Sequence, residues 1–264
     1  MKKAVFFDLD DTLLNDRKSI QTAFDVTCGD LEQKYGIGQA EIEASVREAA
    51  REQYQQYSFY PVTLHLGINP FEGLWGDFGD VHHWQLRQMG KDISDYQLKT
   101  WKKGLAAVGI QGAADWAKER FREVRRRSPF LYEDTIAVLD QLKENGCRLL
   151  LLTNGAPSLQ LEKLTMTPEL VPYFEHIVIS GNFGFGKPDP SIFAHALKLM
   201  DVRAEEAIMI GDNLGTDILG ATRLGMESIL IDHGDGRKVD GATPTYVVRT
   251  LSEVADTLQK LTSV

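Results

Sequence analysis

The chain has 264 residues, of which 43% are hydrophobic and 25% charged, proportions that are ordinary for a globular protein of one or two domains. The formal net charge of −9 argues against a nucleic-acid backbone or an anionic membrane as a general partner. Cys28 and Cys147 fit neither a metal-binding spacing nor a disulfide framework, and no apolar run is long enough for a signal peptide or a membrane span. We therefore expect a cytoplasmic protein.

The predicted elements fall into three parts along the chain. Residues 1–16 contain one apolar strand, Ala4-Val5-Phe6-Phe7, and the acidic segment that follows it. Residues 17–127 read as helices, and all four tryptophans lie among them, where we expect them to fill a small core. The helices of this part are predicted at 42–57, 95–108 and 113–127, with a broken helix or irregular loop at 60–80.

Residues 128–264 alternate between buried strands and helices. Alternating units of this kind imply a parallel, doubly wound sheet, and the first strand belongs to the same sheet. The sequence therefore predicts an α/β fold with a Rossmann-like core formed by residues 1–16 and 128–264, interrupted by an all-α domain formed by residues 17–127. The strands are predicted at 147–152, 176–179, 207–210, 228–231 and 246–248.

Two carboxylates, Asp8 and Asp10, follow directly on the first strand. Ligands bind at the carboxyl ends of the strands in open α/β sheets, so both acids are expected in a binding crevice. Their repulsion is tolerable if a cation such as Mg²⁺ or a chemical role holds them there. Asp8 is a candidate nucleophile and Asp10 a candidate proton donor. Two aspartates at this spacing also occur in metal-binding glycosyltransferases and in ordinary turns.

Three later segments place polar groups at the ends of other strands. Thr153 and Asn154 are candidates for holding phosphate oxygens, and Lys187 for neutralising a phosphoryl group and Asp8. Asp212 and Asp217 add hard oxygen ligands for a metal. Taken singly, Thr153 reads as a strand-end hydroxyl, Lys187 as a surface lysine and Asp217 as a helix cap. Their joint occurrence at strand ends favours an active site.

The sequence resembles a phosphatase of the haloacid dehalogenase-like superfamily. The motifs that carry the resemblance span almost the whole chain: Asp8-Leu9-Asp10-Asp11-Thr12-Leu13, then Thr153, Lys187, and Gly211-Asp212 through Asp217. The resemblance implies that Asp8 attacks phosphorus to form an aspartyl phosphate, that Asp10 acts as acid and then base, and that Thr12 helps to fix the loop. It also implies Mg²⁺ bound by the Asp8 carboxylate, the Asp10 backbone carbonyl, Asp212 and Asp217.

The insert resembles the helical cap of the family's first structural subclass, and such caps close over the site and read the leaving group. The branch containing N-acylneuraminate-9-phosphatase and 5′-nucleotidase is similar in length and cap type, as are some prokaryotic phosphoserine phosphatases. We therefore expect a small phosphorylated metabolite as substrate, of the sugar phosphate, nucleotide or phosphoserine type, and a monomer or homodimer. Cap residues that could meet the leaving group are His82, His83, Trp84 and Arg87.

Several alternatives remain at this point. Haloacid dehalogenases lack an acid two residues after the nucleophile, so Asp10 favours phosphoryl transfer over a dehalogenase-type hydrolysis. A phosphosugar mutase keeps both aspartates and stays open. A phosphorylation-activated receiver is disfavoured by the order of its acidic residues. The arginines of residues 120–127 read as a solvated helix face.

Overall fold

The computed structural model describes residues 2–234, 236 and 238–262. The chain divides into two compact units. The sheet unit comprises Met1–Asn15, Leu131–Gly155 and Thr167–Val264, and the helical unit comprises Asp16–Phe130 and Ala156–Met166. The helical unit therefore includes a short segment that follows the second strand, in addition to the long insert. None of the helices in the described part of the chain has the length and apolar character needed to cross a membrane.

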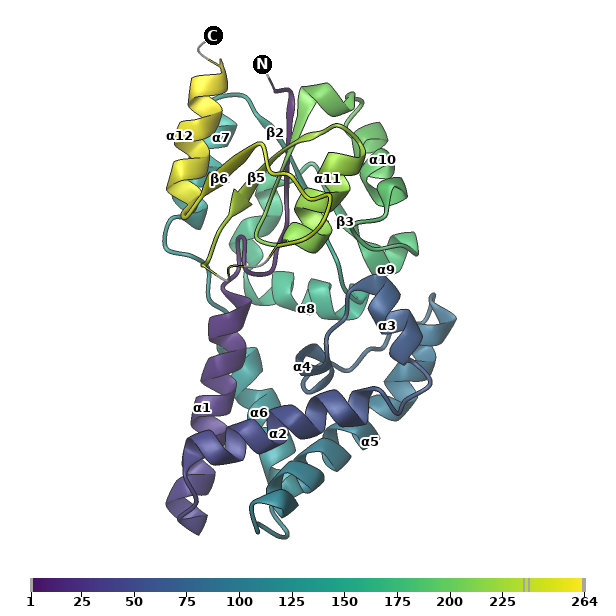
Figure 1. Ribbon diagram of the computed structural model, residues 1–264, viewed down its shortest axis with the longest axis vertical. Helices are drawn as coiled ribbons and strands as arrows, with labels where there is room; N and C mark the ends of the chain where they lie inside the picture. The colour runs from purple at the N-terminus through teal and green to yellow at the C-terminus, as the bar shows by residue number, and fades with distance from the viewer. Residues whose placement is uncertain (1, 235, 237, 263–264) are drawn as a thin grey trace. The chain divides into compact units, whose positions relative to one another are not determined.

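The sheet unit is built on six parallel strands in the order β3-β2-β1-β4-β5-β6 (Figure 1). This is the strand order of a doubly wound sheet whose direction of winding reverses between β1 and β4. The predicted α/β fold is confirmed. The strands are β1 (Ala4–Phe7), β2 (Arg148–Thr153), β3 (His176–Ile179), β4 (Ala207–Gly211), β5 (Glu227–Ile231) and β6 (Tyr246–Val248).

Helices cover both faces of this sheet, which explains why its strands are apolar on both sides (Figure 1). Helices α7 and α12 contact each other on one face, and α10 and α11 contact each other on the opposite face. Alternate residues of β1 point to opposite faces, so Ala4 and Phe6 join the core beneath α10. The helices are α7 (Thr135–Glu144), α9 (Ser180–Phe183), α10 (Pro190–Leu199), α11 (Leu219–Arg223) and α12 (Leu251–Thr262), with a π-helix at Leu214–Ile218 and 3₁₀ turns at Pro168–Tyr173 and Ala204–Glu206.

The helical unit has a core of its own, in which α2 packs on α5 and α1 packs on α6. Gly104 of α5 permits the close approach to α2, since a Cβ there would lie 2.7 Å from the Val46 Cα. The predicted broken helix at 60–80 contains two short helices, and α5 begins earlier than predicted. The helices are α1 (Asp16–Tyr35), α2 (Gln39–Tyr54), α3 (Tyr60–Leu66), α4 (Pro70–Gly73), α5 (Trp84–Ala107), α6 (Ala114–Arg127) and α8 (Pro157–Met166).

The tryptophans divide into two pairs. Trp75 and Trp101 are fully buried in the core of the helical unit, whereas Trp84 is 65% and Trp116 47% exposed. The expectation that all four fill the core is therefore wrong for two of them, because Trp84 is the first residue of its helix and Trp116 lies in the first turn of α6.

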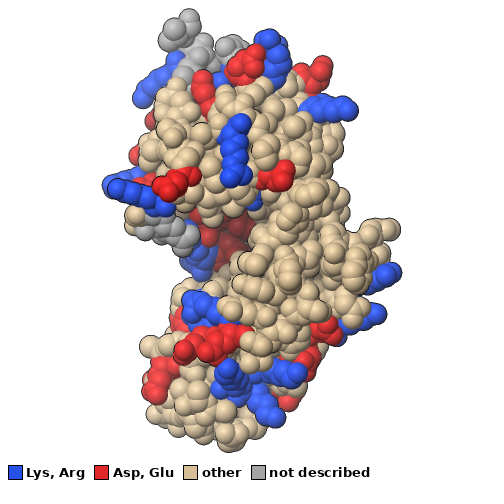
Figure 2. All heavy atoms as spheres, turned by 45° about the vertical axis from the view of Figure 1, so that its right-hand side comes forward, with Lys and Arg blue, Asp and Glu red and all other residues tan. Residues whose placement is uncertain are grey.

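On the face shown in Figure 2, basic side chains alternate with acidic ones instead of gathering in one broad basic surface.

Candidate active site

The centre of the site is a buried lysine that joins two aspartates. Lys187 Nζ lies 2.6 Å from Asp8 Oδ1 and 2.6 Å from Asp217 Oδ1, and it donates to the Leu152 carbonyl at 2.7 Å. Lys187 is only 4% exposed and Asp217 is fully buried. The contacts with Asp8 and with the Leu152 carbonyl are hydrogen bonds, whereas the contact with Asp217 is an ion pair. The alternative interpretation of Lys187 as a surface lysine is thereby excluded, and its side chain holds Asp8 and Asp217 in a fixed relation.

The sheet explains how residues so distant in sequence meet. Phe7 pairs with Ile210 on the adjacent strand, and the Asp8 N–H donates to the Ile210 carbonyl at 2.9 Å. The end of β1 therefore lies beside the end of β4, at the position where the winding reverses. Ligands of doubly wound sheets bind at this position. Asp8 is 7% exposed, so its side chain is largely shielded from solvent.

A second contact fixes the main chain of the lysine. The Asn154 side-chain amide donates to the Lys187 carbonyl at 2.9 Å, and the Lys187 N–H donates to Asn154 Oδ1 at 2.8 Å. Asn154 was predicted to hold phosphate oxygens, yet both ends of its amide contact the backbone of Lys187. This asparagine thus positions the segment that carries Lys187. Next to it, the Gly155 N–H donates to Ser180 Oγ at 2.9 Å, a contact that the sequence did not indicate.

Three carboxylates form the group that could hold a cation. Asp8, Asp212 and Asp217 each offer an oxygen, and these oxygens all lie within 4.8 Å of one another. Gly211 makes this possible, because a Cβ at that position would lie 2.4 Å from the Asp217 carboxylate. The Asn213 N–H donates to Asp217 Oδ2 at 3.2 Å, so Asp217 also closes the turn in which it lies.

The electrostatics of the site follow from burial. Burial raises the pKa of Asp8 to about 6, against the opposing effect of the Lys187 charge. For Lys187, burial disfavours the ammonium, but the carboxylates of Asp217 and Asp8 outweigh this effect and raise its pKa. Lys187 is therefore charged. When Asp8, Asp212 and Asp217 are all ionised, three carboxylates face one ammonium, and the group carries two negative charges in excess. Hard oxygen donors with this excess charge fit a divalent cation such as Mg²⁺.

The remaining predicted residues line the turn after β1 and the end of β2. Thr12 is fully buried, and its Oγ1 lies 3.5 Å from Asp8 Oδ2. Thr153 is also fully buried, and its hydroxyl donates to the Asn154 carbonyl at 3.3 Å. Asp10 is partly exposed and pairs as an isolated bridge with Leu14. Its carboxylate is not one of the three that cluster.

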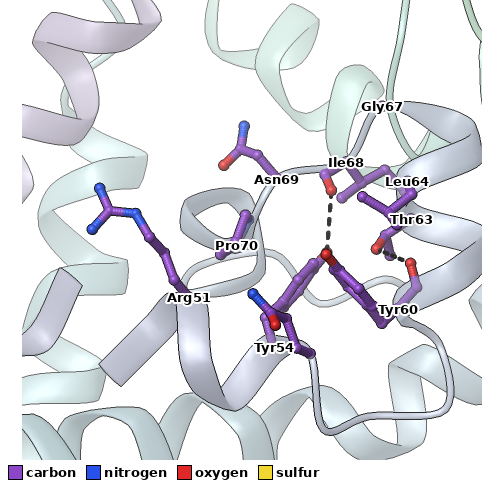
Figure 3. A pocket seen from close by; sticks show the side chains of 10 residues that line it. Arg51, Tyr54, Tyr60, Thr63, Leu64, Gly67, Ile68, Asn69 and Pro70 are labelled. Atoms are coloured by element: carbon purple, nitrogen blue, oxygen red, sulfur yellow. Dashed lines mark hydrogen bonds between the residues drawn. The ribbon is translucent and has the colours of Figure 1, made fainter. Parts of the chain in front are cut away.

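A separate pocket of about 290 Å³ lies in the helical unit between the end of α2, α3 and α4 (Figure 3). The Thr63 hydroxyl donates to the Tyr60 carbonyl at 2.8 Å, and Asn69 caps α4. The Tyr54 hydroxyl contacts the Ile68 carbonyl at 3.5 Å. These polar groups of the pocket thus contact the backbone of the helical unit itself, and the pocket walls are mainly apolar. The charged site of the sheet unit is the stronger candidate for catalysis.

Comparison with known proteins identifies the family. The sequence matches the haloacid dehalogenase-like hydrolase family over residues 2–225. The chain is a haloacid dehalogenase-like hydrolase. It is 34% identical to a phosphoserine phosphatase of Thermus thermophilus, over 96% of this chain and 97% of the relative. It is 29% identical to a glyceraldehyde 3-phosphate phosphatase of Pyrococcus furiosus, over 98% of this chain and 92% of the relative.

A further relative of this hydrolase is the N-acylneuraminate-9-phosphatase of Mus musculus, 32% identical over 64% of this chain and 70% of the relative. Among solved structures, the HAD-hydrolase YfnB from Bacillus subtilis, bound to magnesium, has a TM-score of 0.66 at 19% identity, covering 97% of this chain and 98% of that chain. The likeness to that structure concerns the fold. The family resemblance and the assignment as a phosphatase-type enzyme are confirmed.

Proposed function

We propose that this hydrolase cleaves phosphate monoesters of a small metabolite in a Mg²⁺-dependent reaction that passes through a phosphorylated Asp8. The observation that carries the proposal is the buried Lys187 ammonium, held 2.6 Å from both Asp8 and Asp217. An aspartate so held presents a carboxylate in a fixed orientation, and the lysine offsets part of the charge that a phosphate ester would otherwise meet.

The residues divide the reaction between them. A carboxylate oxygen of Asp8 attacks phosphorus, and the ester oxygen leaves with a proton from Asp10. Asp10 then accepts a proton from water, which adds to the phosphorus of the acyl phosphate and releases phosphate and free Asp8. Asp8, Asp212 and Asp217, with the Asp10 backbone carbonyl, would hold Mg²⁺, and the bound ion would neutralise charge on the phosphoryl oxygens. The assignment of Asp10, and not Asp8, as the acid and base is supported by Asp10 lying outside the three-carboxylate group.

The substrate class follows from the relatives, which are named for phosphoserine, glyceraldehyde 3-phosphate and N-acylneuraminate 9-phosphate. All three are phosphate monoesters of small hydroxyl compounds. We include in the proposal a cap role for residues 17–127, as the part that selects the leaving group, and a cytoplasmic location.

The deciding experiment measures phosphate release from these three esters, a nucleoside monophosphate and a nitrophenyl phosphate. The protein is first freed of metal with a chelator, and Mg²⁺ is then restored. Release should require Mg²⁺ and should be lost in Asp8→Asn, which keeps size and polarity but removes the nucleophile. Turnover that persists in the chelator, or in Asp8→Asn, would contradict the proposal. Analysis of the products for an isomerised sugar phosphate separates a hydrolase from a mutase.

A further inference from the structure

The turn after β1 is held by a histidine that lies more than two hundred residues away in the sequence. His233 Nε2 lies 2.7 Å from the carbonyl oxygen of Asp11, the residue that follows the proposed acid Asp10. The same nitrogen lies 3.3 Å from the Tyr132 hydroxyl, and the two rings stack with centroids 5.5 Å apart at an interplanar angle of 10°. All of these residues belong to the sheet unit.

The partners fix the tautomer of the histidine. A carbonyl oxygen can only accept a hydrogen bond, so His233 Nε2 must carry the hydrogen that it donates to Asp11. Tyr132 is anchored in turn, because its N–H donates to the Leu13 carbonyl at 3.2 Å. The stacked pair therefore reaches the turn after β1 at two places, one on each side of Thr12.

The backbone conformation of Asp11 is strained, so a hydrogen bond that holds it is of use to the turn. Asp11 has φ +57°, in the left-handed region, which a residue with a Cβ adopts at a cost of roughly 1 kcal/mol. The turn closes with the Asp11 N–H donating to the Leu14 carbonyl at 2.7 Å and the Leu14 N–H donating to the Leu9 carbonyl at 2.9 Å. Neither of these two bonds uses the Asp11 carbonyl, which accepts from His233.

We propose that His233 is a positioning residue for the reaction: its Nε2–H holds the Asp11 peptide and thereby sets the orientation of the Asp10 carboxyl group toward the leaving oxygen. This inference rests on the proposed function. The histidine itself touches no reacting atom. A displaced acid fails to protonate the leaving oxygen, so the loss should be largest for esters whose leaving group most needs a proton.

The test compares His233→Gln with His233→Asn. The glutamine amide can reach the place of Nε2 and donate to the Asp11 carbonyl, whereas the asparagine amide is one methylene too short. Single-turnover release of the leaving group is measured with enzyme in excess, for an alkyl phosphate such as phosphoserine and for a nitrophenyl phosphate. The control is His195→Leu, which removes a histidine that also stacks on an aromatic ring, Phe183, at 5.0 Å in the same unit.

His233→Asn should slow release from the alkyl ester by roughly 10- to 100-fold and from the nitrophenyl ester by less than about threefold, since misplacing a catalytic group costs on this order. His233→Gln should recover most of the alkyl rate, and His195→Leu should leave both rates unchanged. Equal losses on the two esters, equal rates of the Gln and Asn variants, or no loss in either would overturn the positioning role. A wild-type enzyme that releases neither leaving group would instead overturn the proposed function.

Discussion

Replacing Lys163 should destabilise the helical unit more than any change to a surface ion pair, because it would leave buried carboxylates without their counter-charge. Lys163 Nζ lies 2.9 Å from Glu72 Oε1 and 3.9 Å from Asp16 Oδ1. Asp16 is also paired with Arg125. All four residues are at most 6% exposed, and their two positive and two negative charges balance. We call these four residues the buried charge cluster.

The magnitude follows from burial. Removing one partner of a buried pair costs about 3–5 kcal/mol, since the other charge remains desolvated, whereas an exposed pair contributes about 0–1 kcal/mol. Lys163→Met, which keeps the length of the side chain and removes its charge, should therefore lower the free energy of unfolding by about 3–5 kcal/mol. Lys103→Met is the matched control in the same unit: its pair with Glu52, at 2.6 Å, is about half exposed on both sides.

The assay is urea unfolding followed by tryptophan fluorescence, because Trp75 and Trp101 are buried in the core of the helical unit. Adding Glu72→Gln to Lys163→Met should recover part of the loss, since the neutral amide removes the unpaired charge while its oxygen can still accept from the Asn69 N–H. Two results would refute the reasoning. One is a free energy of unfolding for Lys163→Met within about 1 kcal/mol of the wild-type value. The other is a double variant, Lys163→Met with Glu72→Gln, that is no more stable than Lys163→Met alone.

Three further outcomes are expected at the site. Asp10→Asn should lose turnover and accumulate phosphate on Asp8, which mass spectrometry of the intact protein and its peptides detects; phosphate on another residue would refute the assignment. Asn154→Ala should lower kcat roughly tenfold, because it releases the backbone of Lys187, and a kcat equal to wild type would show that Lys187 needs no such support. The pKa of Asp8, raised from 3.8 to about 6 by burial, means that the metal-free folded state binds this proton more tightly than the unfolded state. The stabilisation that comes from binding this proton is therefore lost as pH rises through about 6. In chelator, Asp8→Asn should gain stability relative to wild type between pH 4 and 7, on the order of 1 kcal/mol or more. Parallel curves of urea-derived stability against pH for the two proteins would contradict this.

The sequence was sufficient for the parts of the fold that depend on local pattern. Short apolar runs bounded by polar turns located all six strands to within one residue at most of their ends, because strands buried on both faces must be apolar throughout. Helix caps that use a neighbouring backbone donor are equally local: Asp189 Oδ1 accepts from the Ser191 N–H at 2.8 Å. Polar residues at strand ends indicated one site, since parallel strands bring their carboxyl ends to one edge.

Other features depend on contacts between residues far apart in the chain. Arg125 was read as part of a solvated helix face, yet it is 2% exposed, because Asp16 and the face of Trp75 lie against its guanidinium group. Nothing in a run of arginines distinguishes the one that finds a buried counter-ion from its exposed neighbours. The sequence likewise gives no local signal for the place of α8, which follows β2 in the chain but belongs to the helical unit, where Lys163 pairs with Glu72.

At the site, the sequence by itself determined which chemical groups are present, and the tertiary structure decided what each group does. The side-chain amide of Asn154 has the chemistry of a phosphate ligand, but it holds the backbone of Lys187. Gly211 is needed because the Asp217 carboxylate occupies the space of a side chain. His233 carries no local signal at all, and its hydrogen bond to Asp11 exists because β5 ends near the turn that follows β1. Side-chain chemistry is encoded residue by residue, whereas the partner of each side chain is set by the strand order and by the packing of the whole unit.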